Sequence, residues 1–157
     1  MKITDFIYSA MIGVVASCRS MTPMATIAAA RVAGRSTSGN LLLLDRPLFK
    51  YGALAMGVGE LFGDKMKSAP DRTVFLGLSA RMASAGIAGA ALAPNGEEKT
   101  GAAIAIAAAV PLAYITLEAR KKAMAEMGQT KSGLIEDMLI VATGAAIIFF
   151  ATRPNRI

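Results

Sequence analysis

Five long apolar runs restrict the fold of this chain more than any other feature. They cover residues 6–33, 48–66, 73–93, 101–118 and 134–151. A helix needs about 20 apolar residues to cross the roughly 30 Å hydrocarbon core of a bilayer, and four of the runs fit that length as single crossings. A soluble bundle would carry a charged stripe on each helix, whereas run 73–93 contains one charge, Arg81. We therefore predict an all-α, polytopic membrane protein with four to five spans in a single integral membrane domain, residues 1–157.

The basic residues lie mainly between the runs, including a predicted basic loop at residues 119–133. The net charge of +6 would suit a nucleic-acid-binding protein only if these residues formed one surface. At the ends of runs they fit anionic lipid headgroups instead, so we expect membrane lipids and no nucleic acid as partners. With no histidine and one cysteine, the chain lacks an internal disulfide, the usual zinc sites and histidine-dependent catalytic pairs. We expect no cofactor.

The first run is too long for one crossing and is interrupted by polar residues. Its 28 residues would form a helix of about 42 Å. Pro23 lacks an amide proton and disfavours helical angles in the preceding residue. We therefore predict a first span broken near Arg19–Pro23, either as one bent crossing or as a re-entrant hairpin. Irregular backbone inside a membrane must face protein or water, so we expect the break to border a cavity open to water.

Arg19 and Arg81 lie deep inside apolar runs. An arginine at the middle of a membrane helix costs about 2.5–3.5 kcal/mol on insertion scales. Each guanidinium should therefore lie within hydrogen-bond distance of a carboxylate. The acids available in or beside the runs are Glu60, Asp64, Glu136 and Asp137.

These charges and the hydroxyls of the break form the candidate ligand- or ion-binding cluster. Its members are Arg19, Ser20, Thr22, Glu60, Asp64, Arg81, Glu136 and Asp137, with Pro23 as the structural break. Intramembrane charges are functional candidates by default, but compensated ion pairs can also serve only to fix helix packing. Acids in the first turn of a helix complement its dipole, which is a second explanation for Glu136 and Asp137. Whether the cluster holds a metal ion stays open.

Two further patterns bear on assembly. Ser17-Cys18-Arg19 with Thr22 echoes Ser79-Ala80-Arg81 with Ser84; this is either an internal repeat, as in many transporters, or chance. Ala/Gly faces at residues 79–91 and 102–109 suit close helix contacts. We expect a homo-oligomer, with a dimer favoured. The basic residues are distributed too evenly to fix the orientation in the membrane.

Several motifs occur together in a fixed order. They are Arg19-Ser20-Met21-Thr22-Pro23, Gly59-Glu60-Leu61-Phe62-Gly63-Asp64-Lys65, Pro70-Asp71-Arg72-Thr73 with Ala80-Arg81, and Glu136-Asp137. Over nearly its whole length the chain resembles small bacterial membrane proteins grouped as the domain of unknown function 4126. It departs from their pattern at Gly63, where alanine is expected, and at Cys18, where an aliphatic residue is commoner. The resemblance implies an integral membrane protein, and the bacterial inner (plasma) membrane as its location, but no activity.

Three functions fit these observations. The first is a transporter or channel that uses the Arg/carboxylate cluster. It would carry a small solute, such as an anion, or an ion. The second is a non-catalytic membrane scaffold, favoured by the small-residue helices. The third is an Mg²⁺-dependent enzyme acting on lipid phosphate, with the four acids as oxygen ligands. No phosphate-binding glycine loop accompanies these acids, so the enzyme ranks last and we expect no catalytic residues.

Overall fold

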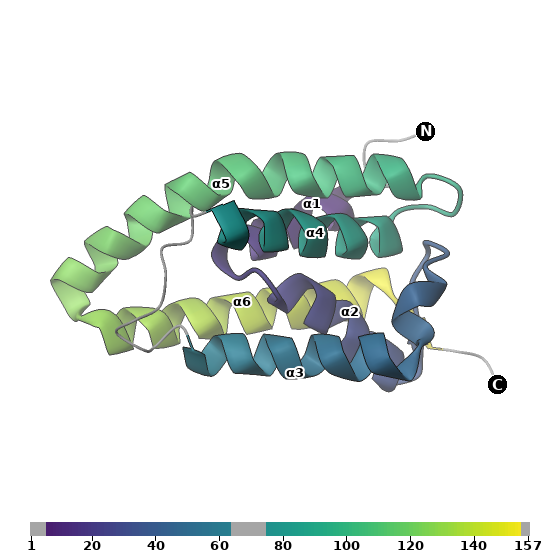
Figure 1. Cartoon of the computed structure of the whole chain (residues 1–157), viewed down its shortest axis with the longest axis horizontal. Helices are drawn as coiled ribbons and strands as arrows, with labels where there is room; N and C mark the ends of the chain where they lie inside the picture. Colours follow the sequence, from purple (N-terminus) through teal and green to yellow (C-terminus); the bar gives the residue numbers. More distant parts are fainter. Residues whose placement is uncertain (1–5, 64–74, 155–157) are drawn as a thin grey trace.

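The apolar runs fold into helices in the computed structural model, which describes residues 6–63 and 75–154 (Figure 1). The helices are α1 (Ile7–Cys18), α2 (Thr22–Val32), α3 (Pro47–Gly63), α4 (Phe75–Leu92), α5 (Glu98–Met127) and α6 (Gln129–Ala151). A short 3₁₀ helix, η2 (Leu42–Asp45), precedes α3, and strands β1 (Arg35–Ser36) and β2 (Arg153–Pro154) pair antiparallel. Helices α4, α5 and α6 are long and apolar enough to cross a membrane, and α1 is a shorter apolar helix. The all-α prediction is confirmed.

The helices form two layers, with α1, α4 and α5 in one and α2, α3 and α6 in the other (Figure 1). Glycines allow the first layer to pack closely. A Cβ at Gly89 would lie 2.4 Å from Cβ of Ala105 and 2.6 Å from the carbonyl oxygen of Gly101. A Cβ at Gly13 would lie 2.4 Å from the carbonyl oxygen of Ala105. The small-residue faces that suggested a homo-oligomer therefore make contacts within one chain, and the dimer stays a prediction that needs another surface.

Helices α1 and α2 form a hairpin, which agrees with the re-entrant alternative and not with one bent crossing. Ser9, near the start of α1, donates a hydrogen bond to the carbonyl of Gly89 at 2.9 Å. Gly39, which follows α2, donates to the carbonyl of Ala91 at 3.0 Å. Both open ends of the hairpin thus lie beside the C-terminal end of α4. The 12 residues of α1 span about 18 Å, so the tip of the hairpin reaches the middle of the bundle (Figure 1).

Arg35 holds the open end of the hairpin against the end of α6. Its guanidinium donates to the hydroxyl and the carbonyl of Thr152 at 2.6 and 2.8 Å, and to the carbonyl of Phe149 at 3.2 Å. A cation at the C-terminal end of a helix complements the helix dipole and satisfies carbonyls that have no helical partner. This contact joins the segment that follows α2 to the C-terminal end of α6.

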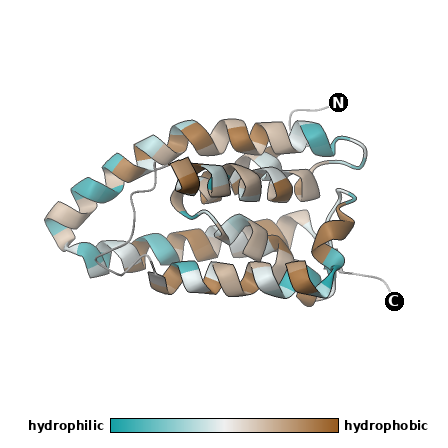
Figure 2. Cartoon of the chain, viewed as in Figure 1, coloured by the Kyte–Doolittle hydropathy of each residue, from teal (hydrophilic) through white to brown (hydrophobic). Residues whose placement is uncertain are grey.

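The predicted basic loop at residues 119–133 is wrong, because helix continues through almost all of it. Helix α5 runs to Met127, α6 starts at Gln129, and Gly128 alone separates them with φ of 81°. Ala, Arg, Lys, Glu and Met favour helix whether or not a membrane surrounds them, so the end of an apolar run does not end the helix. Glycine adopts the positive φ without strain. Figure 2 shows hydrophilic residues at this turn.

Large apolar side chains cover much of the outer surface. Leu48, Phe62, Phe75, Met138 and Phe149 are between 69% and 87% exposed. Single exposed apolar residues are ordinary on soluble proteins, but broad apolar surface marks contact with lipid or with another protein. Together with the long apolar helices α4, α5 and α6, this surface agrees with an integral membrane protein.

Candidate functional site

The tip of the hairpin is the break that the sequence predicted. Helix α1 ends at Cys18, Arg19 is extended with φ −136° and ψ 126°, and α2 begins at Thr22. Pro23 is the second residue of α2, where its missing N–H costs nothing because the first amides of a helix have no helical partner. The break near Arg19–Pro23 is confirmed, and the irregular segment between α1 and α2 covers residues 19–21.

The carbonyls at the C-terminal end of α1 are bound by side chains from the neighbouring helices. Arg81 of α4, which is 3% exposed, donates from Nε to the carbonyl of Ala16 at 2.6 Å. Thr116 of α5 donates its hydroxyl to the carbonyl of Ser17 at 3.1 Å. Positive charge at the C-terminal end of a helix complements its dipole. This contact of Arg81 is with backbone, and its predicted carboxylate partner stays a prediction.

The amides before α2 are bound by the carboxylate of Glu60 from α3. Oε1 accepts from the backbone N–H and the hydroxyl of Ser20 at 2.5 and 2.6 Å. Oε2 accepts from the backbone N–H of Met21 at 2.8 Å and from the hydroxyl of Thr22 at 3.4 Å. Glu60 therefore acts as an N-terminal cap for a helix other than its own, and a carboxylate suits the positive end of the α2 dipole.

Arg19 forms a buried ion pair with Asp137 of α6. Nη2 of Arg19 donates to Oδ1 of Asp137, and Nη1 lies 3.5 Å from the backbone carbonyl of Glu60. The two residues are 1% and 9% exposed. The predicted carboxylate partner of Arg19 is confirmed. The dipole explanation for Asp137 is wrong, because α6 begins at Gln129 and its first turn ends well before Asp137.

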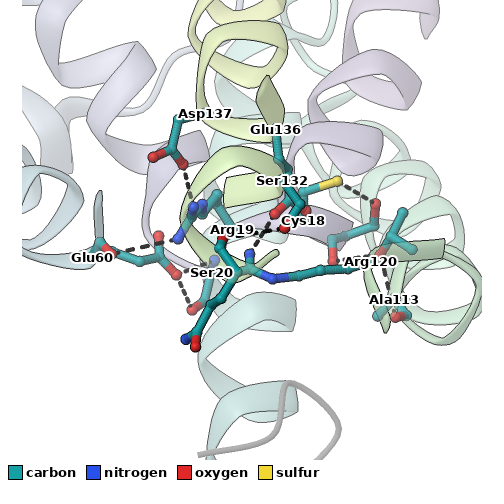
Figure 3. Close-up of polar contacts among 12 residues, drawn as sticks. Cys18, Arg19, Ser20, Glu60, Ala113, Arg120, Ser132, Glu136 and Asp137 are labelled. Atoms are coloured by element: carbon teal, nitrogen blue, oxygen red, sulfur yellow. Dashed lines mark hydrogen bonds and ion pairs between the residues drawn. The ribbon is translucent and has the colours of Figure 1, made fainter. Parts of the chain in front are cut away.

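Glu136 faces away from this pair and binds Arg120 of α5 instead. Their side chains are 16% and 9% exposed, and Nη1 of Arg120 donates to Oε2 of Glu136. Neighbouring residues on a helix point about 100° apart, so Glu136 and Asp137 face different helices (Figure 3). The first-turn explanation for Glu136 is wrong too, because α6 begins at Gln129 and its first turn ends before Glu136.

The structure brings the described members of the expected cluster together through several contacts around the break, and Arg19 reaches both Asp137 and the backbone carbonyl of Glu60. The described members form the Glu60 cap, the Arg19–Asp137 pair, the Arg81 contact and the Arg120–Glu136 pair. Asp64, the remaining member, lies outside the described residues. Within residues 6–63 and 75–154, no group of three or more acidic or cysteine side chains could hold a metal ion, so the described acids give no support to the magnesium site.

Sequence reasoning missed three residues that complete this region. Ser84 accepts the backbone N–H of Met24 at 3.2 Å through its hydroxyl oxygen. The sequence signal for Ser84 was its spacing from Arg81. Ser84 follows Arg81 by three residues, just as Thr22 follows Arg19 by three residues. Arg120 lay in the supposed loop, and Thr116 carried no signal beyond being a hydroxyl in an apolar run.

A pocket of about 240 Å³ lies beside the break, between α5 and α6. Cys18 lines one part of it, and Arg120, Glu136, Met127 and Leu139 line others. This pocket is lined by Cys18, next to the break, and by none of the residues Arg19–Pro23, so a cavity open to water at the break stays a prediction.

The chain matches no protein-family model, no curated protein and no solved structure. The resemblance to the domain of unknown function 4126 stays a prediction from the motifs in the sequence.

Proposed function

We propose that this protein is a bacterial inner-membrane transporter or channel for a small anionic solute, and that the solute binds at the break between α1 and α2. The observation that supports the proposal is the Glu60 carboxylate. It is bound by two backbone amides and two hydroxyls at the N-terminal end of a half-helix. Such helix ends favour anions because unpaired N–H groups and the helix dipole act together.

The location of the break supports transport over a purely structural role. Interrupting a helix inside a bilayer exposes backbone groups that need new partners. Here α3, α4 and α5 each supply one, through Glu60, Arg81 and Thr116. Membrane proteins tolerate broken helices where they line a cavity, and transporters place substrate sites at such breaks.

In the proposed cycle, Glu60 and the solute alternate at the same amides. The Glu60 carboxylate occupies the position that an anion would take at Ser20 and Met21. An incoming anion binds there once the carboxylate moves aside, and Glu60 returns when the anion leaves. Arg19 and Asp137 neutralise each other beside the break, so the pair adds a rigid wall with little net charge.

The test is anion-driven current in proteoliposomes, measured on a solid-supported membrane with chloride, phosphate and acetate. We expect at least one of these anions to give a current that is absent from empty liposomes. Glu60→Gln should raise the apparent affinity for that anion at least about threefold, because a neutral amide competes less well for the α2 amides. Glu118→Gln is the matched control, since Glu118 is exposed and contacts Lys121 on its own helix.

Two results would contradict the proposal. One is the absence of current for every anion tested in vesicles that contain folded protein. The other is an equal response of Glu60→Gln and Glu118→Gln. Either result would favour the membrane scaffold, in which the polar contacts only fix helix packing.

A further inference from the structure

The pocket between α5 and α6 reaches the break from one end of the bundle. Its lining extends along α5 from Thr116 to Met127, which is about 16 Å of helix rise. Met127 lies next to the turn at Gly128, where α5 and α6 separate from the other helices (Figure 1). Cys18, the last residue of α1, lines the pocket too. The pocket therefore connects the α5–α6 turn with the tip of the hairpin.

The pocket and the buried ion pair share two stretches of backbone. Cys18 lines the pocket and its neighbour Arg19 belongs to the ion pair. On α6, Glu136 lines the pocket and its neighbour Asp137 binds Arg19. Figure 3 shows Cys18 and Glu136 on one side of Arg19, with Glu60 and Asp137 on the other side. The pocket and the proposed site thus lie next to each other along these two stretches of backbone.

The surface of the pocket is almost entirely apolar, and two charged residues border it. Met127 and Leu139 contribute apolar surface, whereas Arg120 and Glu136 bring opposite charges together. Both charged side chains are largely buried, at 9% and 16% exposure. Burying a charged pair costs desolvation free energy that an apolar pair would avoid. A role in admitting an anion would explain why a charged pair lies here.

We propose that this pocket is the access vestibule of the mid-membrane site and that the Arg120–Glu136 ion pair is its gate. The inference rests on the proposed function and adds the route by which an anion reaches the break. In the closed state Glu136 holds the Arg120 guanidinium. When an anion enters, Arg120 exchanges Glu136 for the anion, which then passes Cys18 to reach the amides before α2.

The only cysteine of the chain, Cys18, reports on this route directly. Cys18 is half-buried, so a small thiol reagent that enters the pocket can modify it. We would measure the modification rate in proteoliposomes with anionic sulfonatoethyl methanethiosulfonate and with cationic trimethylammonioethyl methanethiosulfonate. Both reagents should reach Cys18 from the membrane face that carries the α5–α6 turn. Gln129→Cys on a Cys18→Ser background marks that face.

Charge substitutions at the gate should change the two rates in opposite directions. Glu136→Gln removes the negative charge that pairs with Arg120 and should raise the ratio of anionic to cationic modification at least about tenfold. Arg120→Gln should lower the same ratio by a similar factor. The double variant should return the ratio to near the wild-type value, and Ala123→Trp, which fills the pocket, should slow both reagents. Lys121→Gln is the control, since Lys121 is exposed and does not line the pocket.

Several outcomes would contradict the proposal that the pocket is an access vestibule. One is a parallel rise of both rates in Glu136→Gln and Arg120→Gln, which indicates lost packing rather than a charged gate. Another is modification of Cys18 only from the face opposite Gln129→Cys. Full anion current in Ala123→Trp with Cys18 blocked would refute the vestibule alone. Charge-dependent modification of Cys18 without any anion current would instead refute the proposed function alone.

Discussion

Removing the Glu60 carboxylate should destabilise the protein, because this carboxylate accepts hydrogen bonds from the backbone amides that the break leaves outside a helix. In Glu60→Ala, the backbone N–H groups of Ser20 and Met21 lose their acceptor. A buried donor left without a partner costs about 1–3 kcal/mol. The two amides therefore predict a loss of about 2–6 kcal/mol, with the lower half of that range favoured because Glu60 is only partly buried.

Glu60→Gln separates the hydrogen bonds from the charge. Its side-chain oxygen can still accept from one amide, so we expect roughly half the loss, about 1–3 kcal/mol. The free energy of unfolding would be measured by titrating the purified protein in mild detergent with a denaturing detergent and following helix content. Glu118→Ala, on an exposed part of α5, should stay within about 0.5 kcal/mol of the wild type. A Glu60→Ala variant as stable as Glu118→Ala would refute the capping role.

The remaining predictions concern packing and charge, with the same unfolding measurement. Gly89→Ala should cost about 1–3 kcal/mol because its Cβ would overlap α5, whereas Gly52→Ala, with open space around it, should be neutral or stabilising. Gly128→Ala should cost about 1–3 kcal/mol because φ of 81° with ψ of 161° is a conformation that essentially only glycine adopts; an unchanged stability would mean that the turn adopts another conformation. Arg19→Ala should cost about 3–5 kcal/mol by removing the cation that pairs with the buried carboxylate of Asp137. Arg19→Ala/Asp137→Ala should recover much of that loss, and equal losses in the single and double variants would contradict the ion pair.

The helices and the break could be predicted from the sequence because both depend on local chemistry. The length of each apolar run sets a span, and Pro23 next to Arg19 interrupts the first one. The choice between a bent crossing and a re-entrant hairpin could not be predicted. It depends on contacts such as that of Ser9 with Gly89, which are 80 residues apart in the chain.

The partners of the charges were only partly predictable. The sequence supplied Arg19 and four acids, but the choice of Asp137 depends on how α6 is rotated against the hairpin. The contacts of Glu60 could not be predicted by pairing charged side chains, because Glu60 binds backbone amides and hydroxyls. Arg120 was assigned to a loop because its apolar run ends at residue 118, although helix propensity extends α5 to Met127.

The need of the backbone groups for hydrogen-bond partners does not by itself explain the charged residues at the break. Equivalent groups there are bound by neutral hydroxyls: Thr116 donates to the carbonyl of Ser17, and Ser84 accepts from the amide of Met24. A hydroxyl avoids the several kcal/mol that a charge costs inside a membrane. At the same break the chain nevertheless uses a carboxylate, Glu60, and a guanidinium, Arg81. A site for a charged solute needs charged groups beyond those that the backbone requires. The charges of Glu60 and Arg81 therefore favour transport over a scaffold role.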